Sequence, residues 1–127
     1  MSTELTVSPA ERNALLVENF YAQVDAGDVP AMGALFTSGA RYHRPGYAPL
    51  AGRDEIERFY REERTIRDGH HTLESVVATD DAVAVHGSFA GHLRDGRRAE
   101  HRFAEFFAVS PEGRIARRDT FFFVPLV

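Results

Sequence analysis

The chain has 127 residues, a hydrophobic content of 43% and a formal net charge of −4, with acidic and basic residues interspersed. This composition is typical of one globular domain with a hydrophobic core, and it lacks the basic character expected of a nucleic-acid-binding surface. The absence of Cys excludes a thiolate nucleophile, a disulfide and a thiolate metal site. The 15 basic residues are all Arg, which excludes a Schiff-base lysine.

We expect a loose N-terminus over residues 1–7, and the sequence that follows predicts a helix. Ser8 can cap the first turn, with Pro9 inside that turn and Glu11 closing a capping box. Apolar residues then recur at four-residue spacing, as expected for an amphipathic helix. Gly27 is typical of the residue at which such a helix ends.

Two shorter helices and one strand are predicted next. Asp28 can cap a second helix that runs to about Phe36, and a strand over residues 39–44 is broken by the Pro-Gly pair that follows it. The segment "GRDEIERFYREERTI", residues 52–66, predicts a third helix with apolar residues on one side and charged residues elsewhere.

Beyond this helix the apolar period changes to two, which predicts strands. The turn sequences "TDDA", "RDGR" and "SPEG" separate four strands, over residues 69–79, 82–93, 98–109 and 114–124. Three helices followed by an antiparallel meander predict an α+β fold, in which a cone-shaped, curved antiparallel sheet wraps around three N-terminal helices. We expect residues 1–127 to form one domain.

Strand parity assigns the polar residues of the first strand to faces. Residues i and i+2 share a face, so Tyr42 and Arg44 point one way while Arg41 and His43 point the other. The face that carries Arg44 is the candidate wall of a site.

Pairing in the last hairpin can be counted from its turn. If "SPEG" is a four-residue loop, Val109 pairs with Arg114, and Glu105 then lies opposite Arg118 on one face. Asp119 lies on the other face unless a β-bulge reverses it. The residues that share the Glu105 face are His101, Phe103, Phe107, Thr120 and Phe122.

The "GDVPAMGALF" run, the "GRDEIERFY" segment and the closing "GRIARRDTFFF" resemble the nuclear transport factor 2-like superfamily. Within it, the nearest similarity is to the SnoaL-like polyketide cyclase and ketosteroid isomerase-like branch, over roughly residues 8–124. The resemblance implies a cystatin-like cone with an apolar pocket between helices and sheet. It implies no single reaction, because this fold hosts many functions.

Matching the ketosteroid isomerase pattern residue by residue gives an altered site. Phe20 occupies the position of its oxyanion-hole Tyr, and Arg44 occupies the position of its general-base Asp. Glu105 occupies the position of its second oxyanion acid, and a pocket Tyr is retained as Tyr60. An arginine cannot accept a proton at physiological pH, so steroid isomerisation by the usual mechanism is not expected. "RRDTFF" resembles a strand end of limonene-epoxide hydrolase, with Asp119 as its candidate acid.

The candidate catalytic residues are Glu105, Arg44 and His101. A buried Glu105 must be ion-paired, either as a structural pair or as part of a site. In the functional interpretation, Arg44 binds or polarises a substrate oxygen while Glu105 or His101 moves a proton. The candidate substrate-binding residues are Tyr42, Tyr60, Phe20, Phe103, Phe107, Arg118 and Phe122.

No metal or cofactor is expected. His70 and His71 are neighbours on a strand and face opposite sides, and no H-x-H or HExxH pair occurs. The closing "FFFVPLV" suggests self-association, and sheet-to-sheet dimers are common in the superfamily, so we expect a homodimer. No signal peptide or long apolar run is present, which predicts a cytoplasmic protein with no membrane partner.

Two functions from different classes remain open. The first is a small cofactor-independent acid–base enzyme that acts on an apolar, oxygen-bearing metabolite, as a cyclase, isomerase, dehydratase or epoxide-opening enzyme. The second is a non-catalytic small-molecule-binding or association module of the same fold.

Overall fold

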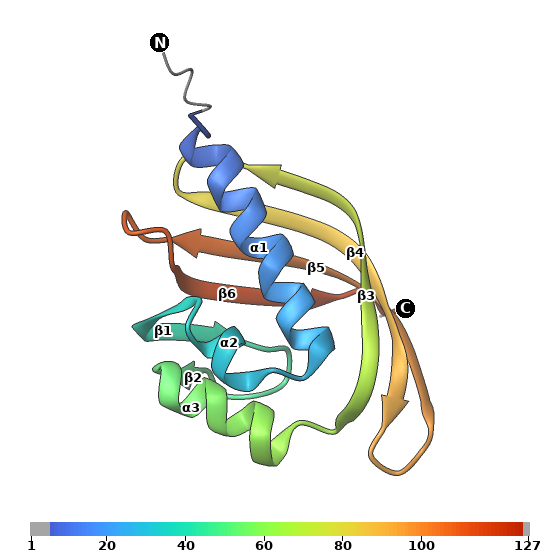
Figure 1. Cartoon of the computed structure of the whole chain (residues 1–127). Coiled ribbons are helices and arrows are strands. Elements are labelled where there is room, and N and C mark those ends of the chain that lie inside the picture. The colour runs from blue at the N-terminus through green and yellow to red at the C-terminus, as the bar shows by residue number, and fades with distance from the viewer. Residues whose placement is uncertain (1–5, 126–127) are drawn as a thin grey trace.

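A computed structural model describes residues 6–125 of the chain. Its helices are α1 (Pro9–Ala26), α2 (Val29–Gly33) and α3 (Arg53–Arg58), and a π-helical turn, η1 (Phe59–Glu63), continues α3. Its strands are β1 (Phe36–His43), β2 (Leu50–Ala51), β3 (Ile66–Ala78), β4 (Ala82–Leu93), β5 (Arg98–Val109) and β6 (Ile115–Phe122). The strands form one sheet in the order β2-β1-β6-β5-β4-β3, and α1 lies across one face of it (Figure 1).

Helix α1 begins and ends where the sequence predicts. The Glu11 backbone N–H donates to the Ser8 hydroxyl over 3.1 Å, and Gly27 adopts a left-handed φ of 72° at the C-cap. Both devices satisfy backbone groups that a helix end leaves without an intrahelical partner.

The middle of the chain corrects four predicted boundaries. Helix α2 ends at Gly33 rather than near Phe36, and β1 begins at Phe36 rather than residue 39, because this segment pairs with β6. That pairing is parallel, so the sheet is mostly rather than wholly antiparallel. Helix α3 with η1 ends at Glu63, and β3 begins at Ile66, earlier than predicted. Strand pairing within the tertiary structure outweighs the local helical pattern.

The last hairpin has a different register from the predicted one. Val109 pairs with Ile115 rather than Arg114, and a bulge follows, so Glu105 lies opposite Thr120 rather than Arg118. The loop is one residue longer than predicted and the bulge adds one more residue, so β6 is shifted by two positions in total. A shift by an even number preserves the face of every side chain, so Glu105 and Arg118 still share a face, as predicted.

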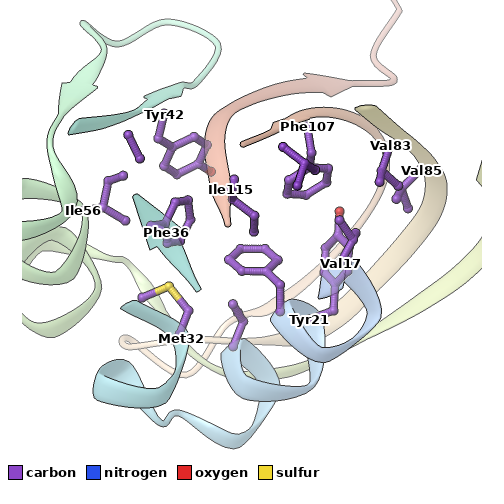
Figure 2. Close-up of a cluster of buried hydrophobic side chains, with 14 of the residues drawn as sticks. Val17, Tyr21, Met32, Phe36, Tyr42, Ile56, Val83, Val85, Phe107 and Ile115 are labelled. Carbon is purple, nitrogen blue, oxygen red and sulfur yellow. The ribbon is translucent and has the colours of Figure 1, made fainter. Parts of the chain in front are cut away.

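The hydrophobic core lies between the helices and the inner face of the sheet (Figure 2). Phe20 is fully buried and packs edge-to-face against Phe36 and Phe107, with 5.6 Å between ring centroids in each pair. Met32 and Ile56 contribute to the same cluster from α2 and α3. This packing occupies one part of the space above the sheet and leaves the remainder for a cavity.

The outer face of the sheet exposes aromatic side chains. Phe106 and Phe121 are 53% and 55% exposed, and their rings meet edge-to-face at 5.9 Å between centroids. Within residues 6–125, no helix is long and apolar enough to cross a membrane.

Candidate functional site

A cavity of about 300 Å³ opens beside the core, between η1, the start of β3 and the inner faces of β1, β5 and β6. It brings together most of the residues predicted from the sequence. Those that line it are Tyr42, Arg44, Tyr60, His101, Phe103, Glu105, Arg118 and Phe122. A second cavity, of about 430 Å³, lies at the C-terminal end of α1 and shares Tyr60, Arg64 and Ile66 with the first.

Two of the predicted substrate-binding residues do not line either cavity. Phe20 and Phe107 are fully buried in the core, where they pack against each other. The neighbour of Phe20, Tyr21, instead directs its hydroxyl toward the polar cluster, and it lies 2.5 Å from Oε1 of Glu105. Phe20, the position matched by resemblance to an oxyanion tyrosine, therefore lies in the core, and the adjacent Tyr21 contacts Glu105 instead.

Glu105 is held by four hydrogen bonds. Its Oε1 accepts from Tyr21 Oη and from Arg118 Nη2 at 2.5 and 3.0 Å, and its Oε2 accepts from Arg118 Nε at 2.5 Å and from the Thr120 hydroxyl. Only 1% of Glu105 is exposed. Both carboxylate oxygens therefore have their partners within the protein.

The electrostatics of this cluster favour an ionised glutamate. Burial alone would raise the pKa of Glu105, but the Arg118 guanidinium and the hydrogen bonds hold that pKa below its usual value. Burial likewise acts to lower the pKa of Arg118, and Glu105 outweighs it. Burial, and then Glu105, raise the pKa of Tyr21, which keeps its hydroxyl proton in place as a donor.

The turn η1 places Tyr60 at the edge of the same cluster. Arg118 Nη1 donates to the Tyr60 oxygen over 2.7 Å, so the Tyr60 proton remains available to a group in the cavity. The Arg118 guanidinium also lies 4.2 Å above the Tyr42 ring centroid. π-Helical turns such as η1 occur frequently at functional sites.

His71 forms a polar pair with Asp25, and the sequence did not reveal it. Asp25 Oδ1 lies 2.5 Å from His71 Nδ1, and Oδ2 accepts the His71 backbone N–H over 2.9 Å. The His71 side chain is 8% exposed and lines the cavity, whereas that of His70 is 78% exposed. Since Nδ1 is engaged by the carboxylate, Nε2 is the ring nitrogen left for a ligand.

His101 lies two strands away from His71 on the same face. Phe89 of β4 pairs with both, and its ring centroid is 4.9 Å from that of His71 and 5.2 Å from that of His101. Burial lowers the pKa of His101, and His71 lowers it further. His101 is therefore neutral at pH 7 and can both accept and donate a proton.

Arg44 reaches the cavity from the other side, as strand parity predicts. Its guanidinium carbon lies 4.6 Å from the Tyr47 ring centroid and 4.2 Å from that of Phe59. On the opposite face of β1, His43 contacts Asp119 at 3.0 Å, so Asp119 does not line the cavity. The bulge in β6 alone would reverse the face of Asp119, but the register shift at the loop adds a second position, so Asp119 keeps the predicted face.

A sequence signal for the missed residues exists in α1. Tyr21 and Asp25 are spaced i, i+4, next to the buried Val17 and Val24, so two polar side chains occupy the core-facing side of an amphipathic helix. Polar groups in such places need partners, which here are Glu105 and His71. Within the described range, no three His, Asp or Glu residues are grouped closely enough to hold a metal ion.

Residues 17–118 match the family of SnoaL-like domains. Solved structures with a similar fold include SalBIII, described as an epoxide hydrolase/cyclase-like enzyme in pyran ring formation in polyether salinomycin, at 20% identity and a TM-score of 0.79 over 89% of this chain and 92% of that one. A putative SnoaL-like polyketide cyclase from Jannaschia sp. CCS1 is 14% identical, with a TM-score of 0.79 over 94% and 91%.

An LEH-like epoxide hydrolase from M. tuberculosis is 18% identical, with a TM-score of 0.79 over 90% of this chain and 84% of that one. No curated protein matches the chain. At these identities the structures confirm the fold that the sequence resemblance implied, and they leave the reaction to be argued from the site.

Proposed function

Because the chain belongs to the SnoaL-like domain family, and because its cavity holds an oriented histidine, we propose that it is a cofactor-independent acid–base enzyme. His71, oriented by Asp25, removes a proton from an apolar, oxygen-bearing substrate. The observation that carries the proposal is the pair of contacts that fix both the ring and the backbone of His71 on one carboxylate.

In this proposal Asp25 orients the ring and His71 moves the proton, as a carboxylate and an imidazole do in other acid–base sites. Asp25 fixes the tautomer with the proton on Nδ1, which makes Nε2 a proton acceptor, and it stabilises the imidazolium that forms. Glu105 is a weaker candidate for the base, because taking up a proton would disrupt four hydrogen bonds and an ion pair. We assign Glu105 to holding Arg118 and Tyr21 in place.

The reaction class follows from what surrounds the base. Loss of a proton from carbon next to a carbonyl leaves the electron pair on the carbonyl oxygen as an enolate. In this proposal the Tyr60 hydroxyl, which lines the cavity and accepts a hydrogen bond from Arg118 Nη1, donates to that oxygen. Return of the proton to another carbon, through His71 or neutral His101, gives isomerisation, and attack of the enolate on a second carbonyl gives cyclisation.

One observation favours a second candidate, a ligand-binding module without catalysis. The charged pair inside the cavity, Glu105 with Arg118, is satisfied internally, as is typical of a structural ion pair. In that case, the cavity would bind an apolar ligand and return it unchanged.

Deuterium exchange separates the two candidates. We would incubate enones, β-keto esters and polyketide-like ketones with the protein in D₂O, and follow both conversion and deuterium uptake by mass spectrometry. We expect uptake with the wild type and its loss in His71→Asn, a change that keeps a donor for Asp25 while removing Nε2. The matched control is His86→Asn, in β4, where the side chain is 45% exposed and does not line the cavity. Binding without uptake would support the ligand-binding module instead.

A further inference from the structure

The Arg44 side chain has no polar partner within the described part of the chain. Its Nε is buried without a hydrogen bond, and no Asp or Glu among residues 6–125 lies within ion-pair distance of its guanidinium. Burying the Arg44 Nε–H without a hydrogen bond reduces the free energy of unfolding, because donors removed from water normally regain their hydrogen bonds within the protein.

The other charges at the cavity do not compensate Arg44. Glu105 is neutralised by Arg118, and Asp25 is engaged by His71. Glu63 also lines the cavity, but it is exposed to solvent, and Arg64 adds a second positive charge beside Tyr60. A ligand in the cavity therefore meets more positive than negative charge, with Arg44 as the donor still to be satisfied.

Two aromatic rings hold the Arg44 guanidinium in place. Tyr47 and Phe59 lie within 5 Å of its carbon, and this packing fixes the side chain while shielding it from water. A guanidinium that is both fixed and partly dehydrated binds a carboxylate strongly, through two parallel N–H···O bonds. We propose that the substrate carries a carboxylate and that Arg44 binds it.

This inference rests on the proposed function, since it concerns the same cavity, and it adds a substrate class. Arg44 follows β1 and His71 lies on β3, and the sheet order places three strands between them. The carboxylate and the carbon that loses a proton are therefore at opposite ends of an otherwise apolar ligand. A keto acid whose two functional groups are separated by an apolar skeleton has this chemistry.

Binding measurements test the inference without requiring turnover. We would titrate the protein calorimetrically with three apolar acids, 2-naphthoate, trans-cinnamate and 4-phenylbutanoate, and with the uncharged amide of each. We expect at least one acid to bind about tenfold or more tightly than its amide, the margin of a charge-assisted hydrogen bond. The preference should disappear in Arg44→Met, which keeps an unbranched side chain between the two rings.

The matched control is Arg41→Met, at an exposed position of β1, the strand that precedes Arg44, and this variant should keep the preference. A second readout is the ¹H–¹⁵N resonance of Arg44 Nε, which should shift with the preferred acid and not with its amide. Equal affinity for acids and amides, failure of all three acids to bind, or a preference that survives Arg44→Met would overturn the inference.

The outcomes also separate this inference from the proposed function. An acid preference that depends on Arg44, together with absence of deuterium exchange on any substrate, refutes the proton transfer and keeps the carboxylate site. Exchange that depends on His71 and occurs equally with acids and amides refutes the carboxylate site and keeps the proton transfer.

Discussion

Asp25 in the last turn of α1 and His71 in β3 are 46 residues apart in the sequence. The Asp25 carboxylate contacts the histidine twice, at Nδ1 of its ring and at its backbone N–H. The second contact links the backbone of β3 to the end of α1. The first leaves a single ring nitrogen for chemistry.

Replacing Asp25 by Asn should reduce turnover by about 10²–10⁴-fold, because an amide no longer selects the tautomer with its proton on Nδ1 or stabilises the imidazolium. Asp25 is a positioning residue, so the decisive readout is the tautomer itself, measured from the ¹⁵N shifts of His71. We expect Nδ1–H in the wild type and a mixture in Asp25→Asn. An unchanged tautomer together with lost activity would contradict this role.

Removing the charge of Glu105 should cost about 3–5 kcal/mol of unfolding free energy, because Arg118 is then left buried without a compensating charge. Chemical denaturation of Glu105→Gln measures this loss. A matched change on the same strand is Glu100→Gln, where the side chain is 62% exposed and the expected effect is within about 0.5 kcal/mol. Similar effects for the two variants would show that the buried pair contributes no more than a surface pair.

The same pair should make stability depend on pH in acid. The pKa of Glu105 is lower in the folded protein than the ordinary value of 4.5, so the folded state binds fewer protons than the unfolded state in this range. The resulting stabilisation is complete above that value and is lost as the pH falls through the depressed pKa. The difference in unfolding free energy between wild type and Glu105→Gln should therefore shrink in acid. A difference that grew toward low pH would contradict the assignment.

His101 should titrate below its ordinary pKa of 6.5, because burial disfavours its charged form and His71 adds to the effect. Its ring should carry one proton at pH 7. The ¹⁵N and ¹³C shifts of His101 between pH 4 and 9 give the midpoint directly. A midpoint at or above 6.5 would mean that His101 is charged during part of the working range and is unsuited to accepting a proton.

We propose that the exposed aromatic face of the sheet forms a homodimer interface, as the apolar C-terminal strand suggested. Phe106→Glu places a charge in the middle of that face and should convert a dimer to a monomer in sedimentation velocity. The control is Leu15→Glu, which charges a 58% exposed apolar position on α1. A monomeric wild type, or a dimer that persists in Phe106→Glu, would refute the interface.

Strand parity accounts for most of what the sequence revealed about the site. The alternation placed Tyr42 and Arg44 on one face of the first strand, and Glu105 and Arg118 on one face of the last hairpin. All four line the same cavity in the structure, although the register in the last hairpin was wrong. The faces were preserved because the longer loop and the bulge at Ala116 each shift β6 by one position and together keep its parity, although neither feature leaves a mark in the hydrophobic pattern.

The residues that the sequence did not reveal depend on tertiary geometry. Asp25 meets His71 only because α1 crosses the sheet above β3, and no local pattern fixes that crossing. Phe20 was assigned to the pocket by its position in a family pattern, but the rotation of α1 turns Phe20 into the core and Tyr21 toward Glu105. A one-residue difference on a helix is about 100°, enough to exchange a core side chain for a site side chain.

The central claim is that His71, and not Glu105, carries the proton. The most direct test compares His71→Asn with Glu105→Gln for deuterium incorporation into the same substrate, with each rate normalised to the folded protein present. We predict that His71→Asn lowers the rate by about 10²-fold or more, and that folded Glu105→Gln loses less. The opposite order, with exchange retained in His71→Asn and abolished in folded Glu105→Gln, would contradict the account.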